Sequence, residues 1–358
     1  MSKARELANL GNAYSDGALS NRNLIINGGM QVAQRGTSFT TPSNIYTLDR
    51  WFSTDNTGAA VTVTQDSDAP DGFTNSAKIT VNAADTSLAV NSVCLLRQNI
   101  EGVNFSQCGF GSSQAKDITI SFWVKSSITG QYSVALNNSA YDRSYVTGYT
   151  ITSANTWEYK SVQISGDTSG TWLTSFSIGA AVHFPVAVEA GKITSGNAWT
   201  SGFNYGVTGQ VNFVGTNNAT FQITGVQLEV GDTATPFEHR SYGDELARCQ
   251  RYFWSLNSGG VSYKYLAQGA NYTNTACYSH IPLPTDMRAV PSLAVSSQTD
   301  FQVVENGSVK NATAVALSGS STKHGVACLF SASVGQGNAS LIRTAATANV
   351  YIHLDAEL

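Results

Sequence analysis

Apolar and polar residues alternate with a period of two along most of this chain, as expected for half-buried β-strands. From Ile118 to Lys125, isoleucine, phenylalanine and valine hold the even positions, while threonine, serine, tryptophan and lysine hold the odd ones. The same alternation recurs near Val61, Ala77 and Tyr132, with glycine-rich turns between the segments. Many short strands with few helical stretches indicate a sandwich or jelly roll.

The alternation breaks at Gly225 and resumes in the opposite phase, which predicts a β-bulge or a bend at a sheet corner. After Pro236 the apolar period becomes helical, and Ser241 to Asp244 has the form of a capping box with Asp in place of Glu. This stretch therefore predicts a helical joint that closes one β domain and begins another. Its apolar positions follow at helical spacing: Leu246, Cys249 and Phe253.

We therefore expect an all-β protein: a jelly-roll sandwich, then a short helix, then a smaller C-terminal β-sandwich tip. The clean alternation from Val350 to Leu354 places the C-terminus inside the tip's sheet. The predicted parts are an attachment segment and linker (1–22), the jelly roll (23–240), the linker helix (241–256) and the tip (257–358).

Charged residues make up 12% of the 358 residues, against roughly 25% in typical soluble domains. Interface cores are depleted in charge, so we interpret this as extensive contact between subunits through Leu246, Cys249 and Phe253. A surface rich in Ser, Thr and Asn is the alternative. The net charge of −4 without a basic stripe argues against nucleic acid as a partner.

The five cysteines are widely spaced, and no secretory signal is evident at Met1 to Leu10. These features favour synthesis in a reducing cytoplasm. No apolar run approaches the roughly 18 residues of a membrane span, so we expect no membrane insertion. Ser2 to Leu10 instead predicts a short helix whose Leu7 and Leu10 share one face. We interpret these two leucines as attachment candidates, with a disordered tail as the alternative.

No catalytic motif is evident: the five histidines are scattered, and neither a nucleophile elbow nor a phosphate loop is present. Asp66 to Gly72 departs from the calcium-loop spacing, so we interpret it as an Asp-rich turn. No cofactor and no metal ligand are predicted. A structural calcium ion stays an option that the sequence does not locate.

Aromatic residues among polar neighbours suit sugar binding, because a ring covers the apolar face of a sugar while amides and carboxylates bind its hydroxyls. Phe203 and Tyr205 belong to this broad set, and Asn137 to Thr150 is its most loop-like cluster. Packing in the core or at a subunit interface is the alternative. The candidates for glycan binding are Tyr141, Asp142, Arg143, Tyr145, Tyr149, Trp172 and, in the tip, Tyr272.

Three quoted segments carry a resemblance: NRNLIINGGMQVAQRGTSF followed by YTLDRW, then QLEVGDTATPFEHRSYGDELARCQRYF, and finally LDAEL at the C-terminus. Together they resemble a family of bacteriophage tail fibre proteins. The resemblance implies a jelly roll like that of carbohydrate-binding modules, a compact β tip and assembly as a homotrimer on a virion. It implies no catalytic residue.

These observations lead to the expectation of a non-enzymatic phage virion structural protein. We expect a trimeric tail fibre that attaches through its N-terminus to other virion proteins and recognises host surface polysaccharide or lipopolysaccharide. Its location would be the tail or capsid surface of the virion, after synthesis in the host cytoplasm. Two alternatives are a capsid or tail decoration without receptor binding and a glycan depolymerase tailspike.

Overall fold

The computed structural model describes residues 3, 5, 21–346 and 349–358, and it shows an all-β protein, as predicted. The attachment candidates Leu7 and Leu10 lie outside the described residues. The chain forms two compact units, 1–245 with Leu358, and 246–357. The predicted domain limits at 240 and 256 lie on either side of this division. Within the described residues, no helix has the length and apolar character that crossing a membrane requires.

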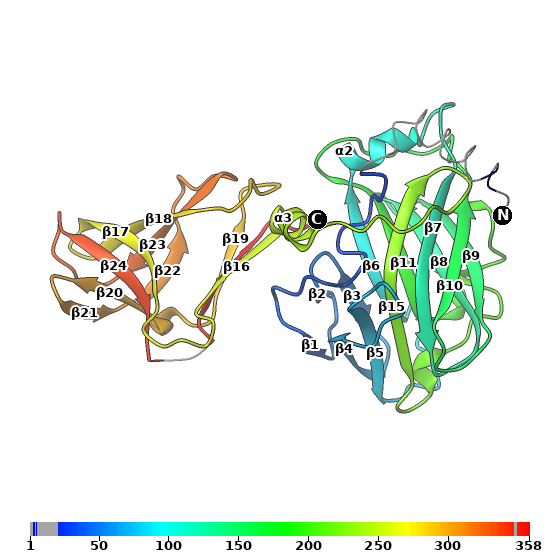
Figure 1. The fold of residues 1–358 in the computed structure, drawn as a ribbon, viewed down its shortest axis with the longest axis horizontal. Helices are drawn as coiled ribbons and strands as arrows, with labels where there is room; N and C mark the ends of the chain where they lie inside the picture. The colour runs from blue at the N-terminus through cyan, green and yellow to red at the C-terminus, as the bar shows by residue number, and fades with distance from the viewer. Residues whose placement is uncertain (1–2, 4, 6–20, 347–348) are drawn as a thin grey trace. The chain divides into compact units, whose positions relative to one another are not determined.

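The first unit is a sandwich of two antiparallel sheets (Figure 1). The six-stranded sheet has the order β1 (Ser38–Thr40), β4 (Ala60–Asp66), β5 (Ser76–Ala83), β15 (Thr220–Val230), β7 (Ile118–Ser126) and β10 (Glu158–Ile164). The seven-stranded sheet has the order β13 (Trp199–Ser201), β9 (Arg143–Ile151), β8 (Gly130–Asn138), β11 (Ile178–Val188), β6 (Val93–Glu101), β3 (Phe52–Asp55) and β2 (Ile45–Tyr46). A small parallel pair, β12 (Ile193–Thr194) and β14 (Gly206–Val207), accompanies them.

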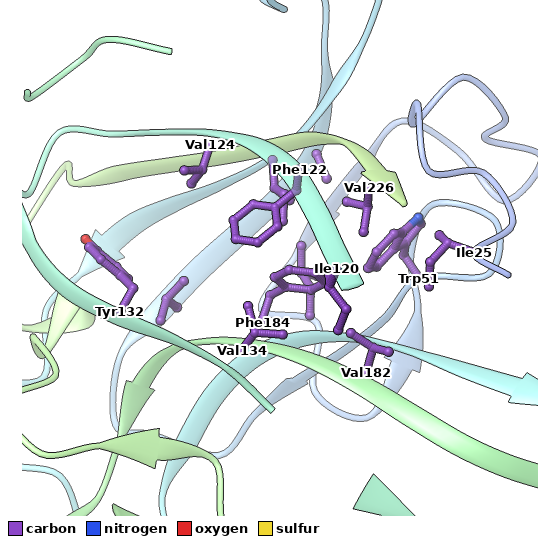
Figure 2. Packing of buried hydrophobic residues seen from close by; sticks show 14 of the residues in the cluster. Ile25, Trp51, Ile120, Phe122, Val124, Tyr132, Val134, Val182, Phe184 and Val226 are labelled. Atoms are coloured by element: carbon purple, nitrogen blue, oxygen red, sulfur yellow. The ribbon is translucent and has the colours of Figure 1, made fainter. Parts of the chain in front are cut away.

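The core of the first unit lies between the two sheets, where the alternating apolar positions of both meet (Figure 2). The ring of Phe184 lies 5.2 Å from Phe122 and 6.0 Å from Trp51, measured between centroids. All three side chains are fully buried. Because burying one such side chain contributes roughly 1.5–3 kcal/mol, these rings are a main source of the unit's stability.

The predicted bulge at Gly225 is confirmed. The register of β15 against β7 shifts between Thr224 and Gln227, and Gly225 has a φ of +61°. A Cβ atom at Gly225 would lie 2.6 Å from Cζ of Phe73. Only glycine combines this left-handed backbone with so close a neighbour, so the change of phase in the sequence has a steric cause.

The first two quoted segments meet around one arginine in the first unit. Arg240 forms ion pairs with Glu238 at 3.1 Å and with Glu245 at 3.3 Å. The backbone N–H of Asn23 donates to Glu238, and that of Asn27 donates to Glu245. Burial raises the pKa of Glu238, but the backbone N–H groups of Asn23 and Asn21 together with Arg240 outweigh it and hold the pKa below its usual range. These hydrogen bonds and ion pairs therefore hold the two segments together and give them a structural role.

The helix predicted over 241–256 is shorter in the structure, where α3 spans Tyr242–Gln250. Phe253, expected on its apolar face, instead begins the strand β16 (Phe253–Asn257). The Ser241 hydroxyl oxygen accepts the backbone N–H of Asp244 at 3.2 Å, which is the first bond of a capping box. The Ser241 hydroxyl also donates to the Asp244 carboxylate at 2.6 Å, a bond between two side chains. Between residues 21 and 346, the remaining helical segments have three or four residues each: α2 (Gly102–Phe105) and the 3₁₀ turns η1 (Ser106–Cys108), η2 (Ala190–Lys192), η3 (Phe213–Gly215) and η4 (Gln298–Asp300).

The second unit contains two sheets around the Phe301 and Phe330 rings, whose centroids are 5.9 Å apart. The C-terminal strand lies inside the smaller sheet, as predicted. That sheet has the order β16 (Phe253–Asn257), β25 (Tyr351–Asp355) and β19 (Ser292–Val295). The larger one has the order β21 (Ser308–Asn311), β20 (Phe301–Glu305), β24 (Ala339–Thr344), β17 (Tyr265–Thr273), β18 (Ala276–Pro282), β23 (Gly325–Ser331) and β22 (Ala314–Leu317).

Candidate functional site

The seven-stranded sheet of the first unit turns its second face away from the core. Alternation places Phe184 of β11 in the core and its neighbour His183 on the opposite face. The segment 189–211 packs on that face, where Phe203 and Tyr205 contact an apolar group with Leu95. The Ser133 hydroxyl donates to the carbonyl oxygen of Tyr205 at 2.8 Å and fixes the segment to β8.

A groove of about 320 Å³ lies beside segment 189–211, which contributes Lys192, Phe203 and Tyr205 to its lining. Its volume falls in the range of small-molecule sites, roughly 300–1,000 Å³. The lining combines aromatic rings, amide side chains and two cationic side chains. The lining residues are Asn44, Thr54, Asn56, Asn91, Val93, Arg97, Tyr141, Lys192, Phe203 and Tyr205.

Tyr141 forms one wall of the groove from the turn between β8 and β9. Its φ is +55°, an unusual backbone conformation for a tyrosine. The buried side chain of Asn138 holds this turn, because its Oδ1 accepts the N–H of Asp142 and its Nδ2 donates to the Asp142 carboxylate at 2.7 Å. A backbone held in a costly conformation at a groove wall points to a functional constraint.

Three aromatic rings form a continuous row along this wall. The ring of Phe203 lies 4.2 Å from Tyr141 and 4.3 Å from Tyr205. Tyr205 is buried, and burial raises the pKa of its hydroxyl far above the ordinary value of 10.0. Tyr141 and Phe203 are half-buried, so part of each ring is open to the groove.

Arg97 and Lys192 supply the charge of the groove. Arg97 on β6 donates a hydrogen bond from Nη1 to the hydroxyl oxygen of Tyr141 at 3.0 Å, and its guanidinium lies 4.3 Å from the Phe52 ring centroid. The Lys192 Nζ lies 5.8 Å from the Phe203 ring. Among the described lining residues, none is an Asp or a Glu. The groove therefore has a positive character.

Two buried polar side chains lie on the same face of the sheet. The register pairs Ala135 with His183 and Asn137 with Ala181, so His183 and Asn137 are diagonal neighbours. Neither side chain has a hydrogen-bond partner among the described residues. Burial and the nearby charge of Arg97 hold the pKa of His183 well below its ordinary value of 6.5, so the imidazole is neutral. His183, whose ring lies 5.1 Å from that of Tyr205 and 6.1 Å from that of Phe203, is thus an uncharged polar neighbour of these rings.

Tyr141 is the one sequence candidate that lines the groove. Asp142 beside it is exposed, and Arg143 forms a two-bond ion pair with Asp167 at 2.8 and 2.7 Å, which raises the pKa of Arg143. Tyr272 lies in the second unit, where it is 71% exposed. The remaining candidates are core residues at 6–7% exposure and lack the surface that sugar binding needs: Tyr145, Tyr149 and Trp172.

Sequence reasoning missed both cations and the amides of the groove. Arg97 comes from β6, Lys192 from η2, and Asn44, Asn56 and Asn91 from three separate turns. Nothing in their spacing brings them together. The sequence did draw attention to Phe203 and Tyr205 as aromatic residues with polar neighbours, and both belong to the site.

The residues predicted for the subunit interface have different degrees of exposure. Cys249 is fully buried, and Phe253 is 3% exposed with its ring 5.0 Å from His353. Both side chains are covered by the chain itself, so they are not surface groups available to a second copy. Leu246 remains partly exposed. The interface prediction therefore now rests on Leu246.

The Asp-rich segment from Asp66 to Gly72 contains a turn, as interpreted from its spacing. Asp66 accepts hydrogen bonds from the Asp68 N–H at 2.8 Å and from Lys78 at 2.9 Å. Asp68 accepts from Lys125 and from the Trp157 indole N–H. No group of three potential metal-ligating side chains occurs among the described residues.

No protein-family model and no curated protein matches this chain. Solved structures with a similar fold include carbohydrate-binding modules and one phage tailspike domain. The enzymatically active domain of tailspike protein 4 from bacteriophage CBA120 has a TM-score of 0.31 and 14% identity over 59% of this chain and 22% of that chain.

The module TmCBM61 in complex with β-1,4-galactotriose has a TM-score of 0.30 and 13% identity, over 59% of this chain and all of that chain (100%). The tandem CBM22-1–CBM22-2 domain of Xyn10C from Paenibacillus barcinonensis has a TM-score of 0.31 and 9% identity, over 94% of this chain and 96% of that chain. Membership of the phage tail fibre family stays a prediction from the quoted segments.

Proposed function

We propose that the first unit binds a host surface glycan in the groove beside Tyr141, and that the chain is a non-enzymatic fibre protein of a phage virion. The observation that carries the binding proposal is the pair of half-buried rings of Tyr141 and Phe203, backed by the buried ring of Tyr205, with amide side chains in the same groove. Rings of this kind cover the apolar face of a pyranose, and amides bind its hydroxyl groups.

The wall of the groove is organised before any ligand arrives. The Asn138 side chain fixes the turn, and Arg97 and Phe203 fix the Tyr141 ring. A binding group that is already ordered loses less conformational entropy on association, which favours affinity. The unusual φ of Tyr141 is consistent with a ring held in place for contact with a ligand.

The groove is better suited to binding than to cleavage. Hydrolysis of a glycosidic bond ordinarily requires two carboxyl groups that face each other across the bond. The described lining residues include no carboxylate. Tailspike depolymerase activity at this groove would therefore need acidic groups that its lining does not supply.

The virion assignment rests on the quoted segments and on the low charge content of 12%. In this proposal the protein is a homotrimer on the tail or capsid surface, attached through its N-terminus to other virion proteins. Leu246, partly exposed on α3, is the contact that we assign to neighbouring subunits. A decoration protein without receptor binding is the second candidate. It is favoured if the purified protein binds no host glycan in solution.

The test is to incubate the purified protein with host lipopolysaccharide or capsular polysaccharide and to measure both binding and product length. Binding without shortened products that Tyr141→Ala strongly weakens supports the proposal. Tyr159→Ala, which removes an exposed ring from β10 of the six-stranded sheet, is the matched control and should leave that binding unchanged. Absence of binding favours the decoration protein, and released oligosaccharides favour the depolymerase.

A further inference from the structure

The two cations of the groove have no anionic partner in the described part of the chain. Arg97 makes one hydrogen bond, to the hydroxyl oxygen of Tyr141, and Lys192 lies near the face of Phe203. Neither side chain forms an ion pair with a described residue. Both are half-buried, so each has lost part of its hydration without gaining a carboxylate.

Two nearby carboxylates, those of Glu189 and Asp55, accept hydrogen bonds from turn residues and not from the two cations. Glu189 accepts the backbone N–H groups of Asn91 at 3.2 Å and Gly191 at 3.0 Å. Asp55 accepts the N–H of Thr57 at 3.0 Å and its hydroxyl at 2.7 Å. These acids stabilise the turns that carry the groove's amides, and they leave the two cations uncompensated.

Arg97 is arranged to bind an oxyanion. Its strand β6 and the Phe52 ring fix the guanidinium, and only Nη1 is used for a described hydrogen bond. A guanidinium has five N–H donors in a rigid fork that matches carboxylate and phosphate oxygens. Lys192 adds a flexible point charge at the same groove.

We propose that the glycan bound in this groove is acidic, carrying a carboxylate or a phosphate group that Arg97 and Lys192 recognise together. This inference rests on the proposed function and specifies the class of its ligand. The rings bind the sugar face, the amides bind hydroxyl groups, and the two cations bind the anionic substituent.

The experiment measures binding of the full chain to an array of saccharides, in which neutral glycans are paired with forms bearing a uronic carboxylate or a phosphate. Oligogalacturonate and its methyl ester form one pair with the same backbone. We expect binding to the charged member of a pair, weakening as salt concentration rises. The carboxylate and phosphate arms identify which substituent is recognised.

Arg97→Gln and Lys192→Gln should each weaken this binding roughly 10- to 100-fold, the loss expected for a hydrogen bond to a charged group. Lys323→Gln removes the same charge from an exposed site of the second unit and should have no effect. Because Arg97 also contacts Phe52 and Tyr141, its substitution could destabilise the fold, so the melting temperature of each variant is measured. Lys192 makes no described side-chain hydrogen bond, so Lys192→Gln tests the charge without that complication.

Binding of neutral glycans that Tyr141→Ala weakens strongly, but that neither charge variant changes, would overturn this inference and leave the proposed function intact. Equal binding of the neutral and the charged member of each pair would likewise overturn this inference and leave the proposed function intact. If no glycan on the array or from the host binds, the proposed function and this inference fail together.

Discussion

The hydroxyl oxygen of Tyr141 accepts a hydrogen bond from Arg97 at 3.0 Å across 44 residues of sequence. This bond joins the turn after β8 to the middle of β6 at the candidate groove. It couples an aromatic wall to the guanidinium, so that one side chain presents a ring to the sugar and also orients a cation. The first prediction separates these two roles.

Tyr141→Ala should weaken glycan binding by roughly 30-fold, the effect of losing a binding hot spot of about 2 kcal/mol. Tyr141→Phe keeps the ring and loses only the hydrogen bond with Arg97, so its loss should be several-fold smaller. Titration calorimetry with the host glycan measures both. Equal losses for the two variants would mean that the ring itself contributes nothing.

A second prediction concerns His183, whose pKa is held well below 6.5 by burial and by Arg97. The imidazole is neutral in the folded chain, whereas the unfolded chain takes up a proton below pH 6.5. Stability is therefore unaffected by this group above pH 6.5 and is lost as pH falls toward the folded pKa. One such proton changes the free energy of unfolding by about 1.4 kcal/mol per pH unit.

His183→Gln should accordingly reduce the fall in melting temperature between pH 6.5 and 5.5. Tryptophan fluorescence reports mainly on the first unit, which contains five of the six tryptophans: Trp51, Trp123, Trp157, Trp172 and Trp199. His280→Gln, at an exposed site of the second unit, should keep the wild-type pH dependence. If the melting temperature of His183→Gln fell between pH 6.5 and 5.5 as much as that of the wild type, the prediction for His183 would be contradicted.

A third prediction tests the bulge of β15. Gly225→Ala requires a left-handed alanine, at about 1–2 kcal/mol, and also places a methyl group 2.6 Å from the Phe73 ring. Gly209→Ala has a similar φ of +83° but open space around the new Cβ atom. Gly225→Ala should therefore lower the melting temperature clearly more than Gly209→Ala does. Equal shifts would show that the Phe73 contact is readily relieved.

A fourth prediction concerns assembly. If Leu246 packs against neighbouring subunits, light scattering should give the wild-type protein a mass of about 114 kDa, three times 37.9 kDa. Leu246→Asp should reduce this toward one subunit, because it places a charge in an apolar contact. Ala247→Asp, at the adjacent exposed position of α3, is the control and should assemble normally. A wild-type mass near 37.9 kDa would refute the trimer.

The sequence by itself determined the elements whose cause is local. Period-two alternation identified the strand from Ile118, the phase change identified the bulge at Gly225, and the capping pattern identified α3. Each depends on a few consecutive residues and on the geometry of a strand or a helix end. Placement of the C-terminal strand followed from the same kind of evidence.

The tertiary structure alone decided which aromatic side chains reach the surface and which cations join them. Tyr141 faces the groove while Tyr145, four residues later, is in the core. Arg97 and Lys192 meet Tyr141 through sheet pairing and the path of segment 189–211. Such meetings depend on long-range register and loop paths, which the spacing of residues along the chain does not encode.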